Sequence, residues 1–297
     1  MRIVLTALIM WTCSTAMGEQ VFEPATKISY SLHPTVVANS VTASQAHYKY
    51  SYELNSGLSS IQNIWRFDIR ITSNSVFGMD APLGWSVGVS AIGTIAWGGI
   101  EMERQIPPGK RLSGFSFISP NLPGIVEVFA QGYVPLPKAV QFVDETTPAP
   151  PDREQDSVRA MTVGPSTLTF TTPAEVVVRL IGLKHQSASL GWLGDAKFVL
   201  KLDKRLDQAK AALARDKKKL ARVRLSQFAH ELAKAHDENK TERGKNKNDP
   251  KDKTFVSDEA FQLLKINADF IIAKLPSKGK DKAEDDECRR AEAEKDD

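Results

Sequence analysis

Cysteine is scarce in this 297-residue chain, which contains only Cys13 and Cys288. A disulfide-stabilised scaffold needs many cysteines and a structural zinc site needs several ligands at short spacing, so both classes are excluded. The five histidines do not form the His-Glu-x-x-His pattern of a zinc hydrolase, and no glycine-rich phosphate-binding loop occurs. We therefore expect neither a metal nor a cofactor, and a fold that depends on burying its 41% of hydrophobic residues.

Long hydrophobic segments are also missing. No run reaches the roughly 18 apolar residues that a transmembrane helix requires. The first 18 residues instead resemble an export signal, in which Arg2 supplies the positive charge, residues 3–11 are apolar and small residues follow. Cleavage after Ala16 or Gly18 would suit the preference for small residues near the cut. We expect a secreted protein, either extracellular or periplasmic.

The two cysteines bear on anchoring and on cross-linking. Lipidation of Cys13 is the alternative to cleavage, but the bulky Trp11 and Thr12 are poor residues to precede a lipidated cysteine. If the signal is removed, Cys288 is the one cysteine left. No internal disulfide can then form.

Residues 19–171 alternate apolar and polar side chains with a period of two. Such alternation places one face of a strand in a core and the other in water. Turn signals such as Asn55-Ser56-Gly57 and Pro107-Pro108-Gly109 separate the runs. About eight short strands of this kind predict an antiparallel β-sandwich, with a flattened barrel as the alternative. The runs include Tyr48, Tyr50, Tyr52 and Leu54; Trp65, Phe67, Ile69 and Ile71; Trp85, Val87 and Val89; and Ile95 and Trp97.

From Thr172 the apolar period changes to that of a helix. Thr172, Pro173 and Glu175 form a capping-box start, with a hydroxyl at the N-cap and a carboxylate three residues later. Apolar stripes at spacings of three and four predict a small antiparallel helical bundle over residues 172–276. The charged tail, residues 277–297, has almost no apolar residues, and we expect it to be disordered.

Short motifs in the helical half occur in a distinctive order. They are Leu180-Ile181-Gly182-Leu183-Lys184-His185-Gln186, then Leu190-Gly191-Trp192-Leu193, then residues 202–210, then Leu225-Ser226-Gln227-Phe228, then residues 259–269. Together they cover about a third of the chain and resemble the FIMAH domain, a helical module at the C-termini of secreted bacterial proteins. That resemblance implies an accessory role rather than a defined reaction. The lysine-rich segment 240–253 departs from the family pattern. The β-rich half is similar to uncharacterised secreted bacterial proteins.

One short motif hints at catalysis. Gly84-Trp85-Ser86-Val87-Gly88 matches the Gly-x-Ser-x-Gly nucleophile elbow, which requires a strand, a tight turn and then a helix. Here the β pattern continues to Trp97. Our leading hypothesis is therefore a non-catalytic protein that acts in binding or assembly, and the alternative is an esterase-like hydrolase with Ser86 as its nucleophile.

Aromatic residues in the predicted strands are the candidate ligand-binding residues, with a glycan or a cell-envelope polymer as the expected partner. Such rings stack on sugars in carbohydrate-binding sandwiches, although core packing explains the same alternation. The candidates are Tyr48, Tyr50, Tyr52, Trp65, Trp85 and Trp97.

Basic residues gather in the helical half, where Lys201 to Lys253 hold 17 basic and 9 acidic residues. The export signal and the lack of interleaved aromatic residues argue against nucleic acid as the partner. A third hypothesis is a structural envelope component that grips an anionic surface through residues 240–253.

Overall fold

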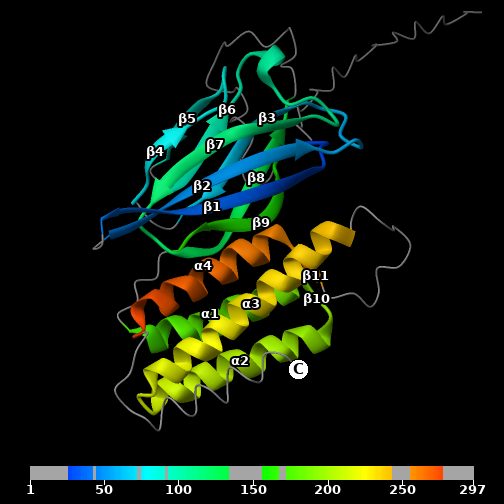
Figure 1. The fold of residues 1–297 in the computed structure, drawn as a ribbon. Helices are drawn as coiled ribbons and strands as arrows, with labels where there is room; N and C mark the ends of the chain where they lie inside the picture. The colour runs from blue at the N-terminus through cyan, green and yellow to red at the C-terminus, as the bar shows by residue number, and fades with distance from the viewer. Residues whose placement is uncertain are drawn as a thin grey trace, which may run out of the picture.

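The computed structural model describes residues 26–42, 45–71, 75–90, 93–133, 156–166, 172–242 and 255–276. A β-sandwich precedes four helices (Figure 1), which confirms the predicted fold class. The predicted export signal, the charged tail and most of the lysine-rich segment lie outside the described residues. Within the described ranges, no helix is both long enough and apolar enough to cross a bilayer.

The sandwich consists of two antiparallel sheets. Sheet A has the strand order β1-β2-β7-β4, and sheet B has the order β5-β6-β3-β8-β9. The strands are β1 Tyr30–Thr42, β2 Gln45–Ser56, β3 Ile64–Arg70, β4 Phe77–Asp80, β5 Ser86–Val89, β6 Thr94–Gly98, β7 Arg111–Ser119, β8 Pro123–Gly132 and β9 Val158–Pro165.

Aromatic side chains from both sheets fill the space between them. The ring of Phe67 in β3 stacks on Trp97 at 5.4 Å and meets the edge of Phe115 from the opposite sheet at 5.5 Å. The polar end of a buried ring bonds to the opposite sheet: the Tyr52 hydroxyl donates to the Val163 carbonyl at 2.9 Å, and Trp97 Nε1 donates to the Asp80 carbonyl at 2.9 Å. These bonds satisfy the polar atoms while the rings bury apolar surface.

The helices are α1 Pro173–Ser189, α2 Ala196–Ala214, α3 Lys218–Glu242 and α4 Asp258–Lys274. Each contacts the next along the chain and α4 returns to α1, which closes a four-helix bundle. A short ribbon of β10, Leu193–Gly194, and β11, Phe255–Val256, joins the α1–α2 connection to the start of α4.

The helix ends are capped by side chains. The capping box at Thr172 is confirmed, because its hydroxyl accepts from the Glu175 amide at 3.3 Å and the Glu175 carboxylate accepts from the Thr172 amide at 3.0 Å. Where α4 ends, Arg222 Nη1 of α3 donates to the carbonyls of Ile272 and Leu275, each at 2.8 Å. A guanidinium at a helix C-terminus satisfies carbonyls that would otherwise lack a donor.

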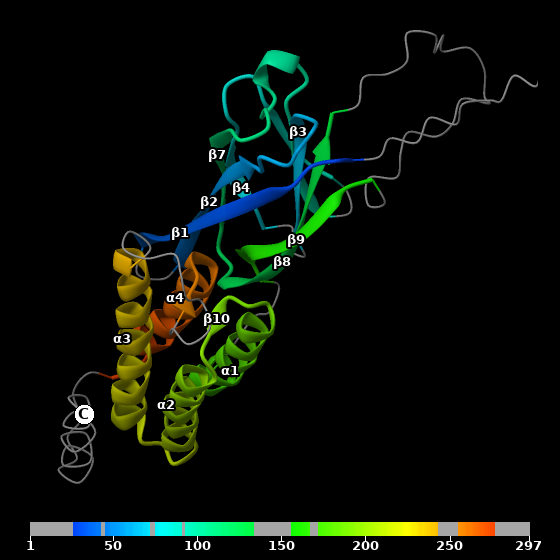
Figure 2. The ribbon, with the colours of Figure 1, turned by 90° about the vertical axis from the view of Figure 1, so that its right-hand side faces the viewer.

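Helix α4 lies against the sandwich, in contact with β1, β8 and β9 (Figures 1 and 2). The contact centres on the turn before β8. Asn267 Nδ2 of α4 and Arg179 Nη2 of α1 both donate to the Pro123 carbonyl, each at 3.0 Å. The hydroxyl of Tyr50 donates to the Asn121 carbonyl in the same turn at 2.8 Å. One turn is therefore bonded to both sheets and to two helices.

Substitution of Asn267, which is completely buried, should weaken this contact. We expect Asn267→Ala to lower the free energy of unfolding by about 1–3 kcal/mol, because it removes a donor from a buried carbonyl. Denaturant unfolding measures the change. The control is Lys265→Ala on the exposed side of α4, where the lost partner is the solvent-exposed Asp269 and the expected loss is below about 0.5 kcal/mol. Equal losses for the two variants would contradict the role of Asn267.

Candidate functional site

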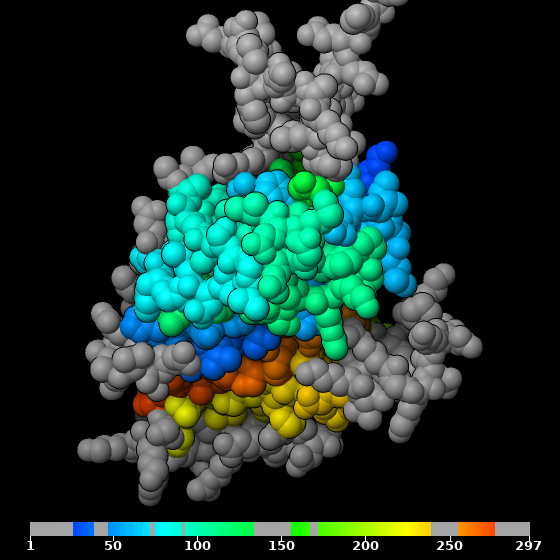
Figure 3. Space-filling view, turned by 90° about the horizontal axis from the view of Figure 1, so that it is seen from above, coloured from blue at the N-terminus to red at the C-terminus, as the bar shows by residue number. Residues whose placement is uncertain are grey.

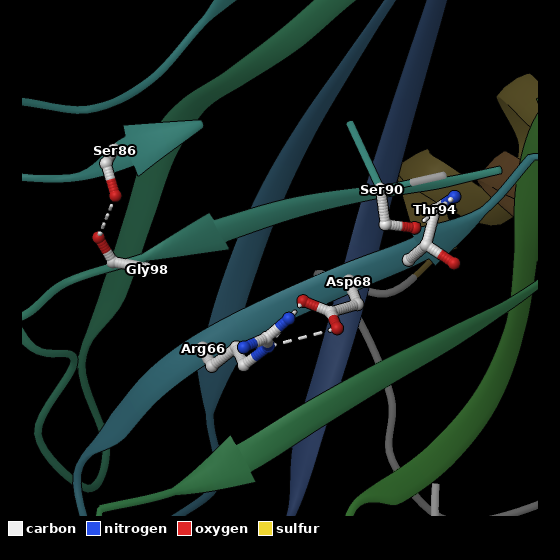
Figure 4. Close-up of polar contacts among 6 residues, drawn as sticks. All are labelled: Arg66, Asp68, Ser86, Ser90, Thr94 and Gly98. Carbon is white, nitrogen blue, oxygen red and sulfur yellow. Dashed lines mark hydrogen bonds and ion pairs between the residues drawn. The ribbon is translucent and has the colours of Figure 1, made fainter. Parts of the chain in front are cut away.

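Ser86 opens an edge strand, not a helix. Its hydroxyl donates to the Gly98 carbonyl of β6 at 3.3 Å (Figure 4), and the chain continues as β5 to Val89. The strand–turn–helix geometry that exposes a nucleophilic serine beside backbone donors is absent at this position. The match to the elbow motif is therefore a match in sequence alone.

The charged side chains on the outer face of sheet B pair with one another. Arg66 Nε lies 2.9 and 3.0 Å from the two carboxylate oxygens of Asp68 (Figure 4). Arg70 pairs with Glu127 at 2.6 Å, and its guanidinium lies 5.2 Å from the ring centre of Phe129. This face is a surface of internally matched charges.

Five of the six aromatic candidates for ligand binding lie in the core. Tyr48, Tyr50, Tyr52, Trp85 and Trp97 are at most 7% exposed, because the inward-facing positions of their strands are the aromatic ones. A ring packed on both faces cannot stack on a sugar, so these five residues are not a glycan-stacking surface. The sixth candidate, Trp65, is half-buried.

Burial also fixes the protonation of the tyrosines. Loss of solvent raises the pKa of Tyr48 to about 12 and holds the pKa of Tyr52 well above its ordinary range. Burial likewise raises the pKa of Tyr50, where neighbouring tyrosines add to the increase and the Arg179 cation opposes it. All three remain hydroxyls at neutral pH, which Tyr50 and Tyr52 need in order to donate to carbonyls.

One lysine and one histidine of the bundle are buried and join neighbouring helices. Lys184 Nζ is completely buried and forms an ion pair with Asp203 that joins α1 to α2, with His185 Nδ1 at 3.2 Å. His236 Nε2 lies 2.8 Å from Asp258, and its ring stacks on Phe261 at 4.0 Å. Among the described residues, no group of three or more His, Cys, Asp or Glu side chains is arranged to hold a metal.

Three loops meet at the end of the sandwich that lies away from the bundle, and we call them the distal loops: residues 57–63, 81–85 and 99–110. Ser56 N donates to the Lys110 carbonyl at 2.8 Å, which joins the base of the first loop to the third. Trp85 Nε1 donates to the Arg104 carbonyl at 2.7 Å, which joins the second to the third. Figure 3 looks onto this end of the molecule.

The distal loops carry the four most exposed large hydrophobic side chains among the residues that the structure describes. They are Leu58 at 91%, Leu83 at 82%, Ile100 at 80% and Ile61 at 73% exposed, and Met102 adds 55%. Scattered exposed aliphatic residues are ordinary, but a concentration at one end indicates a contact surface. The distal loops are thus the candidate functional site.

Patterns in the sequence do not single out these residues. Periodicity finds side chains that face a core, and a residue inside a turn has no period. A usable signal was present: each of Leu58, Leu83 and Ile100 directly follows a glycine or proline in a turn segment.

The tyrosine core should make the fold sensitive to alkali. The unfolded chain ionises near the ordinary tyrosine pKa, whereas the folded tyrosines stay protonated, so their contribution to stability is full below about pH 10 and is lost as the pH rises toward the folded values. We expect the free energy of unfolding to fall between about pH 10 and 12, with a smaller fall for Tyr52→Phe. Denaturant titrations at several pH values measure it. In a Tyr133→Phe background, which removes the half-buried tyrosine outside the core, tyrosinate absorbance that rises near pH 10 while the protein is still folded would contradict this.

Comparison with known proteins gives little more. No model of a protein family matches the chain, and no curated protein matches it. Among solved structures, it is similar to an uncharacterized protein from Nocardia farcinica with an immunoglobulin-like fold, at 12% identity and a TM-score of 0.27, over 47% of this chain and 99% of that chain. A likeness of this degree identifies neither a family nor a function.

Proposed function

We propose that this chain is an exported, non-catalytic binding protein that contacts its partner through the distal loops. The observation that carries the proposal is the concentration of exposed aliphatic side chains on those loops. Loops held by a rigid sheet scaffold are common sites of binding, because the sheets fix the loop ends while the loop side chains can be chosen for the partner. Export rests on the signal-like residues 1–18.

The helical bundle takes the accessory role in this proposal. It contacts the sandwich through the turn before β8, at the opposite end from the distal loops. The sequence resemblance to the FIMAH module supports the same role. A bundle in that position leaves the distal loops accessible.

Binding to glycans, to isolated cell-envelope polymers and to envelope lipids tests the proposal directly. We expect a partner among them, and we expect Leu58→Ser and Leu83→Ser each to weaken its binding about tenfold or more, as for a central contact residue. The matched control is Leu200→Ser, since Leu200 is 66% exposed on α2, away from the distal loops. Binding that all three variants leave unchanged would contradict the proposal. Association that is lost at high salt and unaffected by the loop variants would favour residues 240–253 as the contact.

The hydrolase alternative makes a separate prediction for Ser86. We expect Ser86→Ala to leave any ester hydrolysis by the purified protein unchanged, because no helix follows the serine. The free energy of unfolding should change by less than about 0.5 kcal/mol, since the hydroxyl is exposed. A hydrolytic activity that this variant abolishes would replace the binding proposal with the esterase.

A further inference from the structure

The exposed leucines of the distal loops are held in place by tight turns. Ser60 N donates to the Gly57 carbonyl at 3.1 Å and Trp85 N donates to the Pro82 carbonyl at 2.9 Å, so Leu58 and Leu83 each occupy the second position of a closed four-residue turn. That position projects into solvent and is usually polar. An aliphatic residue there is exposed by the backbone, not by the flexibility of the loop.

The second of these turns needs its glycine. Gly84 has a φ of +80°, and a Cβ at this position would lie 2.5 Å from Cγ of Arg104. The turn therefore packs directly on the third distal loop with Leu83 at its tip. The arrangement is rigid before any partner binds, which lowers the entropic cost of binding.

The distal loops have no net charge. Glu101 and Glu103 are matched by Arg104 and Lys110, and the other two loops contain no charged residue. These loops present no excess of positive charge to a polyanion, in contrast to the basic region from Lys201 to Lys253. The partner must therefore be recognised by apolar contact, and its binding must not depend on a complementary net charge.

The preceding chain joins the molecule at the same end. Thr26 is the first described residue, its hydroxyl donates to the Asp156 carbonyl, and the next residue, Lys27, accepts from the amide of Ile61 at 3.1 Å. Thr26 and Lys27 therefore lie beside the first of the distal loops.

From these observations we infer that the partner of the distal loops is the interfacial region of a neutral lipid bilayer, into which Leu58, Leu83, Ile100 and Ile61 insert. The inference rests on the proposed function and names its ligand. Side chains on separate turn tips fit a surface that rearranges around each of them, whereas a protein partner would need a pocket for each tip. Insertion removes exposed aliphatic surface from water, as in other proteins that lie at the membrane interface.

Vesicles of pure phosphatidylcholine test the inference with the full chain. We expect co-sedimentation that does not change between low and high salt, and a reduction of at least tenfold for Leu58→Asp and for Leu83→Asp. Leu200→Asp on α2 is the control and should bind as the unsubstituted protein does. Since all three side chains are exposed, their unfolding midpoints should agree, which separates lost binding from lost folding.

Three results would overturn the inference. The first is no binding of the unsubstituted chain to the vesicles. The second is equal binding by the loop variants, which would assign the contact to residues outside the distal loops. The third is binding only to anionic vesicles with loss at high salt, which would assign it to the basic region.

If the vesicles are not bound but an envelope polymer is bound in a manner that Leu58→Asp disrupts, the lipid is the wrong ligand while the proposed function stands. If neither binding responds to the loop variants, both fail.

Discussion

The carbonyl of Pro123 joins the two halves of this protein. Proline suits the first position of β8 because its missing amide hydrogen costs the sheet no bond there, and its carbonyl accepts from Asn267 and Arg179. The next residue is glycine, and a Cβ on Gly124 would crowd Cβ of Ser166 at 3.0 Å and Nη2 of Arg179 at 3.1 Å. A proline–glycine pair therefore creates an acceptor that two helices can approach, and the position of the bundle follows from it.

The same turn is tied to the aromatic core. Tyr50 packs against Phe117 at 5.2 Å and donates to the Asn121 carbonyl, two residues before Pro123. Aromatic packing on the inner face of sheet A thus holds the turn, and the turn bonds to α1 and α4. An error in the core would therefore reach the bundle through this turn, beside the direct contacts that α4 makes with β1 and β9.

Local patterns in the sequence predicted local structure well. Alternation in β2 correctly divided Tyr48, Tyr50 and Tyr52 from their polar neighbours, and the spacing of Thr172 and Glu175 predicted the capping box. Alternation could not tell a ring that faces a core from a ring that faces a ligand, because both orientations have the same period. That ambiguity is why the aromatic candidates were misplaced.

Local sequence patterns could not predict contacts between distant residues or the exposure of loop side chains. Asn267 and Pro123 are 144 positions apart, and a buried amide on an apolar helix face gives no indication of its acceptor. The five-residue motif around Ser86 describes composition over one turn, and the β pattern that follows it in the sequence correctly indicated a strand instead of a helix. The distal loops depend on where strands end, which the chain specifies only once the sheets are paired.

The course of β8 has a geometric consequence. The strand begins at the bundle, at Pro123, and ends beside the distal loops, at Gly132. Its ten residues span about 33 Å at the usual rise of a strand. The bundle contact and the distal loops therefore lie at opposite ends of a single strand, and the pairing of β8 with β3 and β9 sets how far apart they are held.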